Sequence, residues 1–153
     1  MHATPAGSLV PLFDRLGGEL AASADGRVLD ADGLRHSLQL DLVRLFNVRN
    51  GLSVAQFLGE APTVLDYGLP DTLALSPQSS ADLDLWQQVL ARAIALYEPR
   101  LVRVTVRVAP DAHRPVAARV AIDAAAMLGR QLCQVQFDVV LDGHGAQGAA
   151  RCA

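Results

Sequence analysis

Lysine is absent from this chain of 153 residues, so all 13 basic residues are arginine. The arginines are scattered along the sequence, and the formal net charge is −3. A nucleic-acid footprint or a patch for anionic membranes requires clustered basic side chains, so we expect neither kind of partner. A nucleotide-composition bias explains the missing lysine better than selection for arginine at interfaces.

Cysteine is almost as scarce. Cys133 and Cys152 cannot make a disulfide framework, and they have no metal-ligand spacing with the four histidines. We therefore expect no metal, no cofactor and a reducing compartment. The sequence also lacks a basic segment followed by a long apolar run, and no stretch approaches the roughly 18 apolar residues of a membrane span. The expectation is a soluble, cytoplasmic protein without direct membrane insertion.

Catalytic motifs are missing too. We find no glycine-rich phosphate loop, no Gly-x-Ser-x-Gly, no His-Glu-x-x-His and no paired-cysteine motif. The one enzymatic alternative is glycoside hydrolysis, which needs two carboxyl groups about 5 to 9 Å apart. Glu98 could be the acid, and its mate would be one of three aspartates: Asp66, Asp71 or Asp138. No carboxyl pair stands out, so we assign no catalytic residue.

Apolar residues at helical spacing predict two main amphipathic helices, over residues 32–49 and 79–97. Short helices are expected at residues 8–16 and 53–58, and residues 17–33 are typical of a linker. Aromatic residues make up only 5% of the chain, so the core must consist mainly of leucine, valine and alanine.

Three runs of alternating apolar and polar residues follow, at 101–109, 116–126 and 132–141. The valines expected on the core side of the first run are Val102, Val104, Val106 and Val108. Short polar loops join the runs, as in hairpins. We predict an α+β fold in which two main helices pack on one face of a small antiparallel sheet, a three-stranded C-terminal meander with room for one extra short strand.

These elements predict one folded domain with two appendages. Residues 1–29 would be an N-terminal segment with a short helix and a linker, residues 30–142 the domain, and residues 143–153 a flexible tail rich in glycine and alanine. A small meander has exposed edges, and nothing obvious in the sequence blunts them. Such an edge can accept a strand from another chain.

The second helix meets the first strand at Glu98-Pro99-Arg100. Pro99 lacks an amide donor and disfavours a helical predecessor, so the helix must end before it. A carboxylate in the last helical turn faces the negative end of the helix dipole, so local structure does not explain Glu98. We expect a partly solvated Glu98–Arg100 pair at the rim of the apolar face, with an arginine fork free to bond a partner bidentately. An ordinary helix stop with two solvated charges is the simpler alternative.

A loop dense in turn chemistry is the second candidate contact. It has the sequence Asp66-Tyr67-Gly68-Leu69-Pro70-Asp71. Gly68 can take a positive φ, Pro70 keeps Leu69 extended, and both aspartates can bond nearby amides. It is either an ordinary surface loop or a rigid contact surface that presents Tyr67.

Three segments follow one another in the order found in a known family. They are LQLDLVRLFNVR at 38–49, the loop at 66–71, and YEPRL at 97–101 before a valine-rich strand. Together with LFDRL at 12–16, they resemble the TssE family of type VI secretion baseplate proteins, which is related to the baseplate wedge proteins of contractile phage tails. The resemblance covers nearly the whole chain. LFNVR at 45–49 departs conservatively from the more usual Leu-Leu-Asn-Thr-Arg type of run.

The resemblance implies a non-catalytic assembly role. TssE-like proteins lie in the cytoplasmic baseplate, join the TssF and TssG wedge subunits, and connect to the contractile sheath of TssB and TssC; TssK is a further candidate partner. The family's Glu-Pro-Arg contact corresponds to Glu98, Pro99 and Arg100, and its sheet is similar to the strand-exchanging part of sheath subunits. The family's old label of tail lysozyme implies the alternative, a peptidoglycan-cleaving glycosidase, which the missing carboxyl pair argues against.

Overall fold

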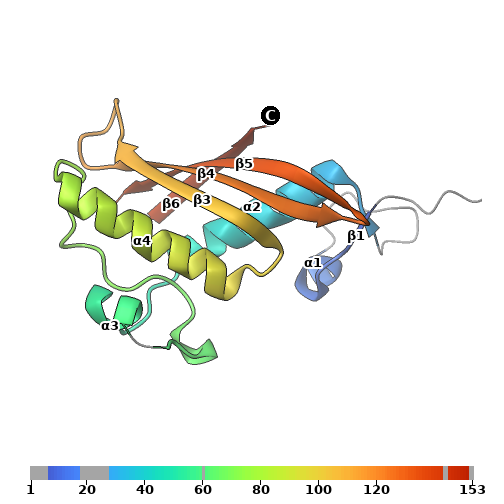
Figure 1. Ribbon diagram of the computed structural model, residues 1–153, viewed down its shortest axis with the longest axis horizontal. Coiled ribbons are helices and arrows are strands. Elements are labelled where there is room, and N and C mark those ends of the chain that lie inside the picture. Colours follow the sequence, from blue (N-terminus) through green and yellow to red (C-terminus); the bar gives the residue numbers. More distant parts are fainter. Residues whose placement is uncertain (1–6, 18–27, 60, 143–144, 152–153) are drawn as a thin grey trace, which may run out of the picture.

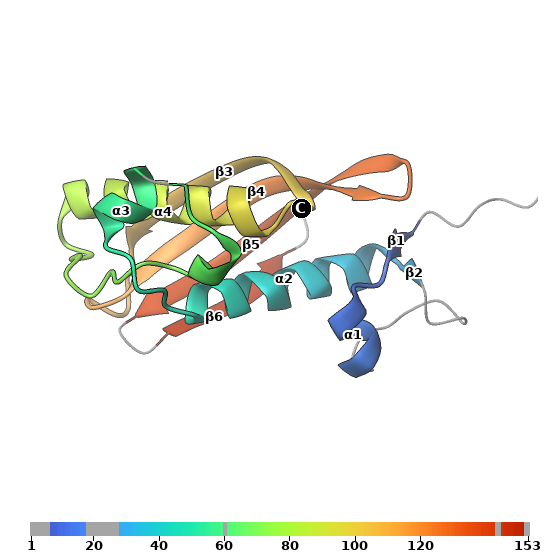
Figure 2. The ribbon, with the colours of Figure 1, turned by 90° about the horizontal axis from the view of Figure 1, so that it is seen from below.

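Two long helices lie on one face of an antiparallel sheet in the computed structural model, which describes residues 7–17, 28–59, 61–142 and 145–151 (Figure 1). The helices are α2 (Ala31–Asn47) and α4 (Ser80–Tyr97). Seen from below, both helices lie on the same side of the strands (Figure 2). This arrangement confirms the predicted α+β fold.

The sheet has four strands that are hydrogen-bonded in chain order: β3 (Leu101–Pro110), β4 (Ala118–Leu128), β5 (Gln131–Asp142) and β6 (Gly145–Arg151). The first three form the predicted meander. Each strand ends within two residues of its prediction, because the alternation of apolar and polar residues marks strands well when one face is covered.

β6 corrects the prediction of a flexible tail for residues 145–151. It pairs with β5 from Asp142↔Gly145 to Gln136↔Arg151. The prediction left room for one extra short strand but did not place it here, because glycine and alanine favour strands poorly. Tertiary contacts override that preference, because α2 packs against β6 and the Asn47 side chain bonds its backbone.

β3 departs from simple alternation near its start. Between Val102 and Thr105 the strand has two residues opposite a single residue of β4, and Arg103 there has a positive φ of 53°. Because of this bulge, Leu101 is buried and Val102 is exposed, whereas Val106 is again buried. The prediction that Val102 faces the core was therefore wrong, since counting by twos cannot anticipate an inserted residue.

The ends of both long helices follow from capping side chains. Asp30 caps α2, because its Oδ1 accepts a hydrogen bond from the Gly33 amide at 2.7 Å. Ser79 caps α4, and its Oγ accepts from the Asp82 amide at 3.3 Å. α2 ends two residues earlier than predicted, and α4 ends where predicted.

The N-terminal segment differs in detail from its prediction. The expected helix at 8–16 divides into a short strand, β1 (Ser8–Leu9), and a helix after Pro11, α1 (Leu12–Gly17). β1 pairs with β2 (Val28–Leu29), which occupies part of the expected linker. The last residues of the expected linker, 31–33, belong to α2, and residues 18–27 lie outside the described residues.

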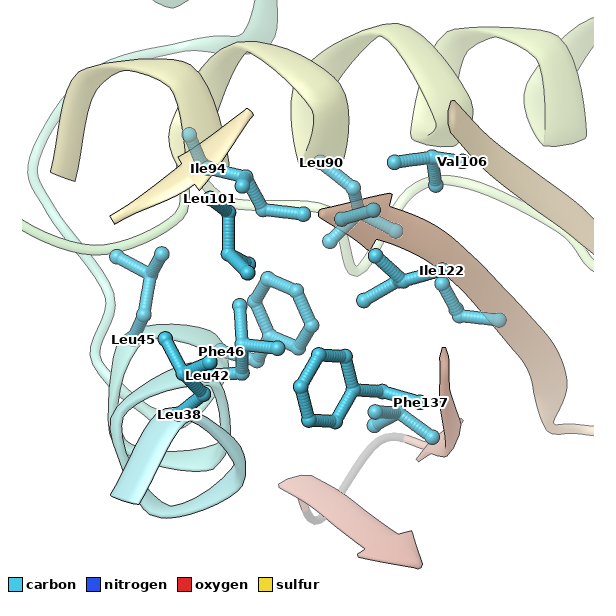
Figure 3. Close-up of a cluster of buried hydrophobic side chains, with 14 of the residues drawn as sticks. Leu38, Leu42, Leu45, Phe46, Leu90, Ile94, Leu101, Val106, Ile122 and Phe137 are labelled. Atoms are coloured by element: carbon cyan, nitrogen blue, oxygen red, sulfur yellow. The ribbon is translucent and has the colours of Figure 1, made fainter. Parts of the chain in front are cut away.

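The core lies between α2, α4 and the sheet, and leucine and valine dominate it. Figure 3 shows its centre, where side chains of all three elements meet: Leu38, Leu42, Leu45 and Phe46 of α2, Leu90 and Ile94 of α4, and Leu101, Val106, Ile122 and Phe137 of the sheet. Each fully buried side chain of this size contributes roughly 1.5–3 kcal/mol. The junction between α4 and β3 is therefore attached to a rigid base.

Candidate functional site

The Glu98-Pro99-Arg100 junction is a tight turn rather than the start of the strand. The Glu98 amide donates to the Ile94 carbonyl at 2.9 Å, which is the last helical bond, and the Leu101 amide donates to the Glu98 carbonyl at 3.1 Å. β3 starts directly after this turn. The turn directs the Arg100 side chain toward α2, where it binds Ser37 and Asp41.

Glu98 and Arg100 form a bidentate ion pair. Arg100 Nε donates to Glu98 Oε1 at 2.7 Å, and Arg100 Nη2 donates to Glu98 Oε2 at 2.7 Å. Only 5% of Glu98 and 26% of the Arg100 side chain are exposed. The expected ion pair is present, but the alternative of two solvated charges is wrong. The arginine fork is also not free, because Glu98 occupies it.

Arg100 uses its remaining contacts on α2. Its Nη2 also donates to Asp41 Oδ2 at 2.5 Å, and its Nη1 donates to Ser37 Oγ at 3.1 Å. Ser37 Oγ in turn donates to Asp14 Oδ2 on α1 at 2.7 Å. Arg44 Nη1 lies 2.9 Å from Asp41 Oδ1 and 3.7 Å from Asp14 Oδ1. We call the whole set the elbow network: Asp14, Ser37, Asp41, Arg44, Glu98 and Arg100.

The elbow network carries a small excess of negative charge, since three carboxylates face two guanidinium groups and leave a formal charge of −1. Burial acts to lower the pKa of Arg100, but hydrogen bonds and charges from Glu98 and Asp41 outweigh it, so the pKa lies above its ordinary value. The guanidinium therefore stays charged. A half-buried charge cluster is tolerated only when its members satisfy one another, as they do here.

The first half of the candidate loop lies beside the elbow network. The rings of Tyr67 and Tyr97 meet edge to face with centroids 5.2 Å apart, and the Tyr97 hydroxyl donates to the Asp66 carbonyl at 2.9 Å. Burial, followed by the charges of Asp41 and Glu98, raises the pKa of Tyr67 above its ordinary value. The structure thus brings Tyr67 within electrostatic reach of the network.

The middle of the loop is a buried support. Gly68 has a φ of 114°, as its predicted role required, and a Cβ there would lie 2.5 Å from the Val48 carbonyl oxygen. The Leu69 amide donates to that oxygen at 2.9 Å, and the Asn50 amide donates to the Leu69 carbonyl at 2.9 Å. Because Gly68, Leu69 and Pro70 are buried, they position the loop on the chain that leaves α2.

The last residue of the loop belongs to a different surface. Asp71 Oδ1 accepts from the Leu73 amide at 3.0 Å, so it caps the turn that follows. Asp71 also lines a hollow together with Leu73, Trp86 and Val116. The predicted contact loop is therefore divided between two surfaces, and only Tyr67 is an exposed neighbour of the elbow network.

Sequence reasoning missed four members of the elbow network. Three of them left a signal, because Ser37, Asp41 and Arg44 follow one another at spacings of four and three and so share one face of α2. Ser37 is also a polar residue within the apolar stripe of that helix. Asp14 left no signal, since its contact with Ser37 bridges 23 positions.

Comparison with known proteins decides the family. The model of the family described as baseplate wedge protein gp25 matches residues 32–130, which is more than half of the chain. The chain belongs to this family. The matched residues contain Ser37, Asp41, Arg44, Glu98 and Arg100 of the elbow network, whereas Asp14 precedes them.

A solved structure described as the baseplate complex from the type VI secretion system resembles this gp25-family chain. The two are 18% identical with a TM-score of 0.47, and the match covers 80% of this chain and 97% of that chain. None of the curated proteins compared with the chain matches it.

The gp25-family chain protects the edges of its sheet more than its sequence suggested. On β6, Asn47 Oδ1 accepts from the Ala146 amide at 2.7 Å, and Asn47 Nδ2 donates to the Ala146 carbonyl at 3.3 Å. Outward-pointing backbone groups alternate along an antiparallel edge, so the next ones are at Gly148 and Ala150. The bulge at Arg103 distorts the β3 edge. The expectation that nothing blunts the edges was therefore wrong.

The candidate glycosidase carboxyl groups have structural partners. Arg100 holds both oxygens of Glu98, and Asp66 completes a capping box with Thr63. Asp138 follows the buried Phe137 on β5, so it lies on the sheet face opposite the helices.

Within the described ranges, no group of three or more histidine, cysteine or acidic residues could hold a metal ion. No helix in that part of the gp25-family chain has the length and apolar character needed to cross a membrane.

Proposed function

We propose that this gp25-family chain is a non-catalytic structural component of a type VI secretion baseplate, of the TssE type. In this role it joins the TssF and TssG wedge subunits, with TssK as a further candidate partner, and connects the baseplate to the sheath proteins TssB and TssC. It works in the cytoplasm. The observation that carries the proposal is the elbow network, a half-buried cluster that ties α1, α2 and the α4–β3 turn together within a wedge-protein fold.

The elbow network suits a docking role because it is held in one arrangement. Arg100 makes four hydrogen bonds to side chains, so its own surface offers little to a partner. The groups left accessible around it are the exposed Arg44, Tyr67 and Pro99 and the partly exposed Asp41. In the proposed contact, Glu98 and Arg100 fix these groups in place, and the wedge subunits bind the surface that results.

The wedge contact is tested by co-purification with TssF and TssG. The double variant Glu98→Ala/Arg100→Ala removes both charges and leaves no buried carboxylate without a partner, so it should fold and yet lose the wedge subunits. Arg107→Ala is the matched control, because Arg107 and Asp123 form an exposed pair at 2.6 Å on the other face of the sheet. Normal co-purification of a folded double variant contradicts the proposal.

The sheath contact is expected at the outer edge of β6, beyond the position that Asn47 occupies. The backbone groups at Gly148 and Ala150 point away from β5 and can pair with an incoming strand. Gly148→Pro removes one outward donor without touching a β5 bond, so TssF and TssG should still bind while sheath polymerisation fails. Sheath assembly at the normal rate would contradict this contact.

A peptidoglycan-cleaving glycosidase is the alternative, and the structure favours it less. A general acid must reach the leaving group, but Glu98 is almost fully buried and both of its oxygens bond Arg100. The proposal therefore expects no release of soluble fragments from peptidoglycan by the purified chain. Release that disappears in Glu98→Gln would establish the enzyme instead.

A further inference from the structure

An apolar patch interrupts the polar outer face of the sheet. Val102, Met127 and Leu132 are 41%, 49% and 40% exposed. The strand register pairs Val102 with Ala125 and Met127 with Leu132, and Ala125 and Met127 are two residues apart on β4, so all four share one face. It is the face turned away from α2 and α4, because the neighbours Ala124, Ala126 and Leu128 are in the core. Ala125 lies between the other three but is fully buried, so the exposed residues are Val102, Met127 and Leu132, which we call the hairpin patch.

Polar and charged residues predominate on the rest of that face, where Ala121 and Val140 are the partly buried apolar residues of β4 and β5. Arg107 and Asp123 form their ion pair there, and Gln134 and Gln136 are exposed on β5. Isolated apolar residues on a surface need no explanation, but a cluster that spans three strands does. The hairpin patch lies toward the β4–β5 turn at Gly129 and Arg130, away from the β3–β4 loop.

The β3 bulge is what turns Val102 to this face. Strict alternation from the buried Val106 would have directed Val102 into the core. The bulge places Arg103 in a left-handed conformation, with a φ of 53°, which costs an L-residue roughly 1–2 kcal/mol. The chain thus accepts strain and exposes a valine, as expected of a bulge that re-aims a side chain for contact.

Two free positive charges flank the hairpin patch. Arg103 follows Val102 in the bulge, and Arg130 lies in the turn between Met127 and Leu132. Both are exposed, and neither has a hydrogen-bond or ion-pair partner among the described residues. Every other arginine whose side chain is described has one. A partner that carries carboxylates could therefore pair with Arg103 and Arg130.

We infer that the hairpin patch is a second docking surface, separate from the elbow network, which binds a segment of a wedge subunit that presents apolar side chains flanked by Asp or Glu. The inference rests on the proposed baseplate role. A second copy of this chain is the poorer occupant, because symmetric pairing would bring four unpaired guanidinium groups together. An apolar segment with flanking carboxylates covers the three exposed side chains and pairs with Arg103 and Arg130.

Oxidation of Met127 tests the inference on the unmodified chain. The chain has two methionines, Met1 and Met127, so peptide mass spectrometry reads the patch at one site. Dilute peroxide should convert Met127 to the sulfoxide readily in the free chain and about fivefold or more slowly in the complex with TssF and TssG. Equal rates in the free chain and the complex overturn the inference and leave the baseplate role intact.

Substitutions test the chemistry of the partner. Leu132→Glu should weaken binding of the TssF–TssG complex about tenfold or more, because it buries a carboxylate against carboxylates. Arg103→Gln/Arg130→Gln should weaken binding and reduce its salt dependence. The control is Val116→Glu, an exposed valine in the β3–β4 loop at the other end of the sheet. An equal loss in this control overturns the inference.

Two further outcomes are decisive. If the free chain sediments as a dimer that Leu132→Glu abolishes, a second copy occupies the hairpin patch and the inference is wrong. If the unmodified chain does not bind TssF and TssG at all, the baseplate role fails and the inference fails with it. Circular dichroism and the melting temperature of each variant show that a loss of binding is not a loss of folding.

Discussion

Removing the guanidinium of Arg100 should destabilise the isolated domain strongly. Arg100→Ala leaves Glu98 with only 5% of its surface exposed and takes away the hydrogen bonds to both of its oxygens. Breaking a buried pair by removing one partner costs about 3–5 kcal/mol. Because 26% of the Arg100 side chain is exposed, water can reach part of the vacated space, and we expect the lower end, about 3 kcal/mol. For a domain of this size the melting temperature should fall by about 6–12 °C.

A double-mutant cycle separates the pair from its parts. We expect Glu98→Ala to lower the free energy of unfolding by about 2 kcal/mol and the double variant to lower it by about 3 kcal/mol. The loss in the double variant is then about 2 kcal/mol smaller than the sum of the losses in the two single variants. Urea unfolding followed by circular dichroism measures each free energy of unfolding. Arg107→Ala, which breaks an exposed pair, should cost under about 1 kcal/mol. If Arg100→Ala costs no more than this control, or if the two effects simply add, the elbow network does not hold the fold as we argue.

Gly68→Ala should lower the free energy of unfolding by about 2 kcal/mol or more, since its Cβ would collide with a carbonyl oxygen. Gly51→Ala should change that free energy little, because a Cβ there meets nothing within 4 Å. Urea titration of the two variants compares the effects. Arg103→Gly should leave stability unchanged or raise it by up to about 1 kcal/mol, and Arg103→Val should lower it, because the left-handed conformation suits glycine and not a β-branched residue; thermal melts decide. Asn47→Ala removes two bonds to the edge strand, so amide hydrogen exchange in β6 should accelerate about tenfold, and unchanged exchange refutes the capping role. The raised pKa of Tyr67 means that the folded state holds the phenol proton more tightly, so this contribution to stability is complete below pH about 10 and lost as pH rises through the folded pKa. Tyr67→Phe should make stability less dependent on alkaline pH.

Local chemistry made the main elements predictable. Pro99 sets the end of α4, Asp30 and Ser79 cap the long helices, and alternation marks three strands. In each case the deciding contact lies within four residues or repeats with a regular period. The predicted pair of Glu98 and Arg100 belongs to the same class, since the two residues are neighbours across a single proline.

Long-range contacts explain what the sequence could not reveal. β6 is held by Asn47, 99 positions earlier, which bonds Ala146, and by α2, which packs against the strand. The additional contacts of Arg100 are with Ser37 and Asp41, which only the fold brings near. The bulge at Arg103 has no glycine, the residue that would have indicated a positive φ in the sequence.

Because β3 contains a single extra residue, the length of the α4–β3 turn determines which side chains of the strand face the core. Leu101 must enter the core immediately after the turn, and Val106 must enter it five residues later, an odd interval that plain alternation cannot supply. A one-residue deletion in this stretch would therefore have one of two effects. Either it would rotate Arg100 away from α2, or it would exchange the core-facing and solvent-facing side chains in the rest of the strand. Insertions and deletions between Glu98 and Val106 should be tolerated only in compensating pairs.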